Sequence, residues 1–128
     1  MPKALLQMKE HEWQTILGQI PAKSNQYEII RVAGRPGLKK STTTLHYEKS
    51  FYMQASKYRG LNIAGLFELH VKVYYPTMSP DLDNCFKCLL DCLQYIKAIR
   101  NDNSCVKILG EKFIDKNNPR IEFRLTEI

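Results

Sequence analysis

The sequence of 128 residues is marked first by the features that it lacks. No apolar run approaches the roughly 20 residues that a membrane-spanning helix needs, and the first residues lack the apolar core of a signal peptide. Internal repeats, low-complexity segments, a glycine-rich phosphate loop and a nucleotide-binding fingerprint are also missing. These absences favour a single cytoplasmic domain, residues 1–128, in which residues 1–12 form a possible N-terminal extension.

Histidine and cysteine offer few conventional ligand sets. The three histidines have no paired spacing typical of a zinc site or of a nucleophile–base couple. Three cysteines lie close together at Cys85, Cys88 and Cys92, which superficially suggests a zinc or iron–sulfur site. On a helix they fall within about 60° of each other, so burial as small apolar side chains is the preferred interpretation. In a reducing cytosol we expect these cysteines and Cys105 to be free thiols.

The charge is distributed unevenly along the chain. The formal net charge is +6, and residues 1–80 carry 11 Lys/Arg against 5 Asp/Glu, whereas residues 81–128 carry 8 of each. A basic excess suggests a polyanionic partner, of which nucleic acid is the commonest. The alternative, a basic protein without such a partner, stays open on charge alone.

The hydrophobic pattern predicts an α+β domain, with a mixed β-sheet packed against two main helices. Alternation of apolar and polar residues marks the strands, and the glycine-containing segment 33–44 is expected to be an exposed, mobile loop. The sequence KNNP (116–119) predicts a closing C-terminal β-hairpin, and Gly110 a bulge. The expected strands are 13–20, 65–75, 104–114 and 120–128; the expected helices are 44–59 and 79–94, with Thr43 or Thr44 and Ser79 as N-caps.

The second helix carries an acidic stripe. Asp83, Lys87 and Asp91 follow each other at steps of four, and Asp81 belongs to the first turn. A structural explanation is available, because acids in a first turn complement the helix dipole and Asp83–Lys87 is an ordinary i, i+4 pair.

Other residues point beyond that explanation. Asn84 adds an oxygen donor, the strand ending in YYP (74–76) leads to the same place, and Asp102 follows the helix where the chain turns back. Three carboxylates converging beside one lysine would repel each other without a cation. Oxygen ligands suit Mg²⁺, with Mn²⁺ as a possible substitute. A basic exterior around such a cluster is typical of a metal-dependent nuclease.

The central motif also carries a family resemblance. The sequence DLDNCFKCLLDCL (81–93) resembles the D-x-D-N-x-x-K-x-x-x-D-x-L signature of the RusA family of Holliday junction resolvases, endodeoxyribonucleases of bacteria and their phages. The segments NDNSCV (101–106) and IPAKSNQY (20–27) are similar to that family's acidic turn and Pro-x-x-Ser-Asn-x-Tyr region. The resemblance covers about residues 13–127. Asn101 stands where members often have a second Asp, which leaves the number of metals open.

The resemblance implies a homodimer that cuts a four-way DNA junction with paired, symmetric nicks, since a two-fold protein matches a two-fold substrate. It implies a Mg²⁺-dependent, bacterial or phage-encoded enzyme. The implied site residues are the metal ligands Asp81, Asp83 and Asp102, catalytic together with Lys87, and the orienting residues Asn84 and Asp91.

DNA contacts are expected mainly in the basic N-terminal part of the chain. Each cation there could equally be an ordinary surface charge, and Asn25 could cap a turn. Tyr27 and Phe51 are candidates for wedging into the junction centre, although core positions are preferred for both. A non-catalytic DNA-binding module and a nuclease for RNA or flapped DNA remain alternatives. The candidate contacts are Lys23, Asn25, Arg31, Arg35, Lys39, Lys40 and Lys112.

Overall fold

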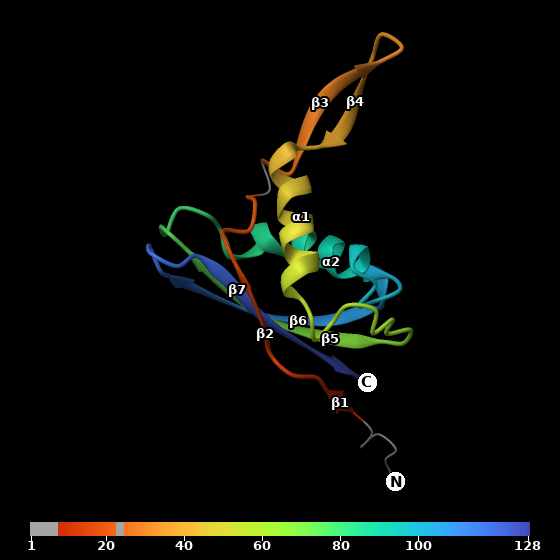
Figure 1. The fold of residues 1–128 in the computed structure, drawn as a ribbon, viewed down its shortest axis with the longest axis vertical. Coiled ribbons are helices and arrows are strands. Elements are labelled where there is room, and N and C mark those ends of the chain that lie inside the picture. Colours follow the sequence, from red (N-terminus) through yellow and green to blue (C-terminus); the bar gives the residue numbers. More distant parts are fainter. Residues whose placement is uncertain (1–7, 23–24) are drawn as a thin grey trace.

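A mixed β-sheet forms the base of the molecule, and both α-helices cover one of its faces (Figure 1). The computed structural model describes residues 8–22 and 25–128. Strand β7 pairs with β1 and β2 on one side and with β5 on the other, and β6 forms the edge beyond β5. The β5–β7 pair is antiparallel and the β5–β6 pair is parallel. The predicted α+β class, with a mixed sheet and two main helices, is therefore confirmed.

The elements follow in the order β1 Lys9–Glu10, β2 Gln14–Leu17, β3 Tyr27–Val32, β4 Arg35–Lys40, α1 Thr42–Gln54, β5 Phe67–Tyr75, 3₁₀ helix η3 Leu82–Cys85, α2 Phe86–Tyr95, 3₁₀ helix η4 Asp102–Ser104, β6 Cys105–Ile114 and β7 Arg120–Glu127. No helix in the described part of the chain is both long and apolar enough to cross a membrane.

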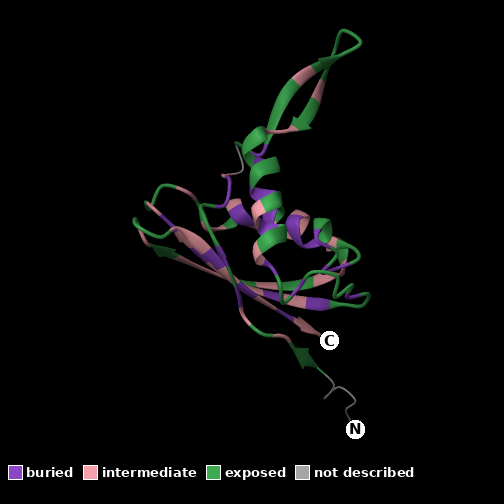
Figure 2. Ribbon diagram, in the orientation of Figure 1, coloured by how far each residue is buried: buried purple, intermediate pink, exposed green. Residues whose placement is uncertain are grey.

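The core lies between the sheet and the helices (Figure 2). In β5, every second residue from Phe67 to Tyr75 is buried, as the alternation of the sequence predicts. Helix α2 adds Leu89 and Leu93 to the core. Cys88 and Cys92 of α2, together with Cys85 at the end of η3, are also buried and free, which agrees with their expected role in packing. The core thus fixes α2 over the central strand.

The predicted C-terminal hairpin is wrong. β6 and β7 flank β5 from opposite sides, so they do not pair with each other. The amide of Asp115 donates to the carbonyl oxygen of Tyr75 (2.8 Å), so the connection passes around the end of β5. β5 therefore lies between β6 and β7 and pairs with both.

Gly110 is not a bulge. The irregularity of β6 lies near its start, where Cys105 and Lys107 face consecutive residues of β5. A Cβ on Gly110 would lie 2.8 Å from the ring of Phe86. The glycine therefore allows the close approach of α2 to β6.

Segment 33–44 is not a loop. β3 and β4 form an exposed two-stranded hairpin that projects from the body (Figure 1). Ala33 and Gly34 form its two-residue turn, and both have positive φ (53° and 80°), as in type I′ turns. The turn lacks the usual Asn-Gly or Asp-Gly pair, which explains why the sequence did not reveal it.

Both helix starts differ from the predictions. Ser41, rather than Thr43 or Thr44, caps α1, because its Oγ accepts a hydrogen bond from the Thr44 amide (3.1 Å). Ser79 does not cap a helix: η3 comes first, after Asp81, and α2 begins at Phe86. The acidic motif therefore begins in a 3₁₀ turn rather than in an α-helix.

Candidate active site

The first two acids of the motif lie near the end of the central strand. Asp81 and Asp83 are exposed, and the hydroxyl of Tyr75 donates to the carbonyl oxygen of Asp81 (3.4 Å). Burial, followed by the neighbouring Cys85 thiol, raises the pKa of Tyr75 well above its ordinary value, and the charges of Asp83 and Asp81 add to this. The expected approach of this strand to the acids is thus present.

Lys112 holds the loop that leads to these acids. Its ammonium donates to the carbonyl oxygens of Met78 (3.1 Å) and Pro80 (2.9 Å). The sequence suggested a DNA contact for Lys112. In the structure it connects β6 to the residues immediately before Asp81, which suits a positioning role.

Lys87 lies between two other acids. Its Nζ atom is 2.8 Å from Oδ1 of Asp91 and 3.7 Å from Oδ2 of Asp102. The hydrogen bond with Asp91, followed by the charges of Asp91 and Asp102, raises the pKa of Lys87 above its ordinary value. Lys87 therefore stays protonated at neutral pH, and it can stabilise negative charge but cannot act as a base. The Asp91 contact replaces the predicted Asp83–Lys87 pair, since η3 breaks the helical spacing.

The turn that carries Asp102 is fixed by two amide side chains. Oε1 of Gln94, on α2, accepts a hydrogen bond from the amide of Asp102 (3.2 Å). Oδ1 of Asn101 accepts from the amide of Asn103 (3.1 Å), so Asn101 caps η4. These contacts hold Asp102 beside α2, where it meets Lys87.

The predicted metal ligands have suitable chemistry, since carboxylate oxygens are the donors that Mg²⁺ prefers. The three side chains do not meet at one point. Asp102 associates with Lys87, whereas Asp81 and Asp83 lie near Tyr75. Within residues 8–22 and 25–128, no group of three or more His, Cys, Asp or Glu side chains is arranged to hold a metal ion. The convergence of the three acids around an ion stays a prediction.

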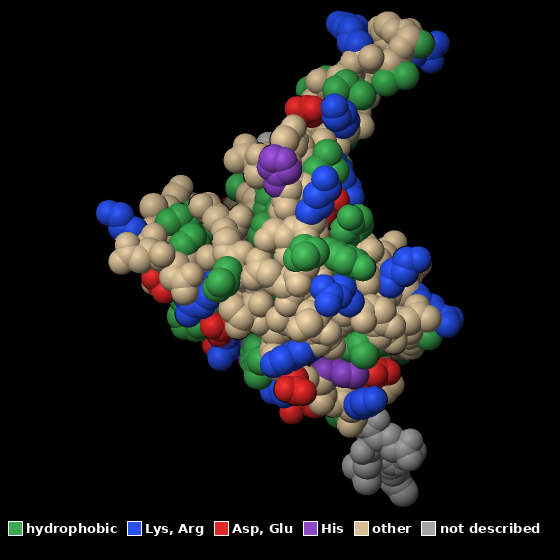
Figure 3. Space-filling model, viewed as in Figure 1, with side chains coloured by type: hydrophobic (Ala, Val, Ile, Leu, Met, Phe, Trp, Pro, Cys, Tyr) green, Lys and Arg blue, Asp and Glu red, His purple; other side chains and the backbone are tan. Residues whose placement is uncertain are grey.

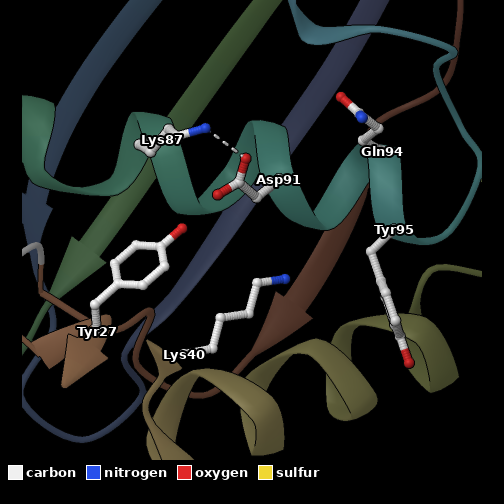
Figure 4. A pocket seen from close by; sticks show the side chains of 6 residues that line it. All are labelled: Tyr27, Lys40, Lys87, Asp91, Gln94 and Tyr95. Atoms are coloured by element: carbon white, nitrogen blue, oxygen red, sulfur yellow. Dashed lines mark hydrogen bonds and ion pairs between the residues drawn. The ribbon is translucent and has the colours of Figure 1, made fainter. Parts of the chain in front are cut away.

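A cleft of about 340 Å³ lies between the base of the hairpin and α2 (Figure 4). Lys40 reaches it from β4 and also forms a 2.6 Å ion pair with Glu48, whose side chain is only 4% exposed. This pair joins the hairpin to α1. The lining residues are Tyr27, Lys40, Lys87, Asp91, Gln94 and Tyr95.

Gln26 is a positioning residue that the sequence analysis missed. It is buried, and its Nε2 atom donates to the carbonyl oxygens of Pro21 (3.2 Å) and Asn84 (3.3 Å). Asn84, predicted to orient its neighbours, donates its amide to the carbonyl oxygen of Asp81 (3.2 Å). Gln26 lies within IPAKSNQY (20–27), but a single Gln in a sequence does not indicate that it will be buried.

The remaining predicted DNA contacts lie mostly on the hairpin, whose tip displays basic side chains (Figure 3). Arg31, Arg35 and Lys39 are exposed. Asn25 is also exposed, and its amide closes a turn onto the carbonyl oxygen of Ala22 (2.8 Å). Lys23 lies outside the described residues.

The two wedge candidates differ in position. Phe51 is fully buried in the core, as preferred, whereas Tyr27 is 40% exposed in the cleft. The preferred core position is therefore wrong for Tyr27.

A small basic α+β domain with an acidic motif beside a cationic arm has the features of a nucleic-acid-processing enzyme. The family described as Endodeoxyribonuclease RusA matches residues 18–126. The chain belongs to this family, as its central motif predicted, and membership implies an endonuclease that resolves Holliday junctions. Among curated proteins, no match was found.

Proposed function

We propose that the protein is a Mg²⁺-dependent endodeoxyribonuclease that resolves four-way DNA junctions by paired, symmetric nicks. The observation that carries this proposal is the position of Lys87, whose ammonium lies beside both Asp91 and Asp102. This contact brings Lys87 and Asp91 of the motif next to Asp102 of the following turn. The proposed partner is branched DNA, and a homodimer would present two such sites to a two-fold substrate.

The proposed metal ligands are Asp81, Asp83 and Asp102, with Mn²⁺ as a possible substitute for Mg²⁺. A divalent ion there would polarise the phosphate and lower the pKa of a bound water. Lys87, which stays protonated, would stabilise charge on the phosphate or on the leaving oxygen. Asp91 would orient Lys87 through their 2.8 Å contact.

The hairpin is the proposed DNA-tracking arm. Arg31, Arg35, Lys39 and Lys40 lie on it with only one acid, Glu28, so its field favours phosphates. Contacts of this kind position a duplex without reading its sequence. We propose DNA contacts for Lys23 and Asn25 as well. Lys112 would contribute to DNA binding through the loop before Asp81, which it holds.

A cleavage assay tests the proposal. A synthetic four-way junction, a plain duplex and a flap are each incubated with Mg²⁺ and with EDTA. We expect nicks in the junction with Mg²⁺ alone. Asp83→Asn should abolish cleavage and leave junction binding intact, because it removes a ligand charge without changing the shape of the side chain. Cleavage by this variant, or by the wild-type protein in EDTA, would refute the metal assignment.

Lys87→Ala separates catalysis from stability. If Lys87 acts on the phosphate, turnover is lost while the free energy of unfolding changes little, because an exposed i, i+4 pair contributes only about 0.3–0.5 kcal/mol. A variant that is destabilised but still cuts at the wild-type rate would show that Lys87 is only a salt-bridge partner.

A second candidate function is a junction-binding module without catalysis. It is favoured by the lack of a preformed three-acid group in the described part of the chain. It predicts equal junction binding with Mg²⁺ and with EDTA, and no nicked product under either condition. Preferential cutting of the flap would instead indicate a nuclease for another branched nucleic acid.

A further inference from the structure

The cleft between the hairpin and α2 has two aromatic walls. Tyr27 begins β3 and Tyr95 ends α2, and they are 40% and 48% exposed. Figure 4 shows them on opposite sides of the hollow, with Lys40 between them and Lys87 and Asp91 along one wall. Tyr95 contacts the ring of Tyr52 edge-on, with the ring centroids 6.4 Å apart. The exposed parts of Tyr27 and Tyr95 offer flat apolar surface with a polar hydroxyl beside the motif lysine, a combination enriched at interfaces.

The apolar surface continues from the cleft along the hairpin. Side chains of alternate residues share one face of a strand, so Tyr27 and Ile29 lie on the same face. Ile29 pairs with Leu38, and these side chains are 77% and 73% exposed. The basic hairpin thus presents an apolar track that leads into the cleft. Such a surface suits a DNA strand whose bases, as well as its phosphates, contact the protein.

The charges within the cleft are nearly balanced. Lys40 faces the carboxylate of Glu48, and Lys87 faces that of Asp91. Attraction for phosphate is therefore weaker here than along the hairpin. Besides this weaker attraction, the cleft offers its tyrosine rings for stacking. Any base can stack on them, because each base has a flat π-face.

We propose that this cleft binds an unpaired nucleotide of the branched DNA next to the cleavage site, with its base stacked against Tyr27 or Tyr95. The proposal rests on the proposed junction-cleaving function. A paired base within a duplex has both faces covered by its neighbours, whereas a base at a branch point can be splayed out. The volume of about 340 Å³ lies within the range of roughly 300–1,000 Å³ for small-molecule sites.

The test uses four-way junctions that carry the fluorescent base 2-aminopurine at positions beside the branch, bound by the Asp83→Asn protein in EDTA. Stacking on a tyrosine ring should change the fluorescence on binding. At least one of Tyr27→Ala and Tyr95→Ala should weaken junction binding roughly 5- to 150-fold, as loss of a stacked base does, and reduce the fluorescence change. Tyr27→Phe and Tyr95→Phe keep the ring and should behave like the parent.

Two controls separate stacking from general effects. Phe113, 38% exposed on β6, is a comparable ring away from the cleft, and Phe113→Ala should bind as the parent does. The second control is the salt dependence of junction affinity. Lys39→Ala should lower the slope of log affinity against log salt by about 0.9 for each lost phosphate contact. The tyrosine variants should leave this slope unchanged, because stacking releases no counterions.

The outcomes distinguish this inference from the proposed function. If the wild-type protein cuts junctions but both alanine variants keep full affinity and fluorescence change, the stacking cleft is refuted and the nuclease proposal stands. If the wild-type protein binds junctions without cutting, the nuclease proposal fails and the fluorescence result still decides the cleft. Without any binding of branched DNA, both fail.

Discussion

Replacing Lys40 by methionine should destabilise the protein by about 3 kcal/mol at neutral pH. Lys40 is the partner of Glu48, at 2.6 Å, and the Glu48 side chain is only 4% exposed. The substitution leaves a buried carboxylate without its counter-ion. Breaking a buried pair in this way costs roughly 3–5 kcal/mol, and the lower end applies because Lys40 itself is partly exposed.

Urea unfolding of the variants measures this difference. The control is Lys39→Met, which removes the neighbouring pair with Glu28, where both side chains are about half exposed and the charged atoms are 3.6 Å apart. That change should cost less than about 1 kcal/mol. The double variant Lys40→Met/Glu48→Leu removes both charges and should recover most of the lost stability.

The pH dependence supplies a further check. The hydrogen bond with Glu48 is the main cause that raises the pKa of Lys40 above its ordinary value of 10.5. Because the folded pKa is the higher one, the stabilisation is complete below pH 10.5 and is lost as the pH rises through the folded pKa. The difference between wild type and Lys40→Met should therefore shrink at strongly alkaline pH. Equal, small effects of the Lys40 and Lys39 substitutions would refute the reasoning.

Three further predictions concern packing, loop position and thiol reactivity. Gly110→Ala should lower the free energy of unfolding by about 1–3 kcal/mol, because the new Cβ would lie 2.8 Å from Phe86. The control Gly65→Ala, whose Cβ would have no atom within 4 Å, should leave that free energy unchanged, as measured by urea unfolding. Lys112→Met should slow junction cleavage and lower the free energy of unfolding by about 1.5–3 kcal/mol, because its charged ammonium donates to two backbone carbonyls; unchanged turnover would contradict its role in holding the loop. Under native conditions a thiol reagent should modify Cys105 first, because Cys85, Cys88 and Cys92 are buried. Equal rates for all four thiols would be inconsistent with the fold.

The sequence was most informative for elements that bury one face and leave the other partly exposed. The alternation in β5 follows from burial of a single face, so this strand was predicted correctly. Strand connectivity was not, because KNNP (116–119) predicts a reversal but does not say which strand lies beside the returning chain. The β3–β4 hairpin was missed because its turn uses Ala33, a residue that rarely adopts positive φ.

The site was predictable to the extent that it lies in local sequence. The spacing of Lys87 and Asp91 implied proximity, and the expected approach of Asp102 to this lysine is also present. Glu48 and Gln26 could not be identified in this way. Their importance comes from burial between elements distant in sequence, and a polar residue gives no advance sign of tertiary burial.

The position of β7, between β2 and β5, has a consequence for how the protein is made. Strands β2 and β5 are joined only through β7, since each pairs with it and not with the other. Until residues 120–127 leave the ribosome, the nascent chain holds an incomplete sheet with an open apolar edge, which is a state prone to aggregation. Folding must therefore wait for the end of this segment, so we expect no folded nuclease on a ribosome stalled before residue 120.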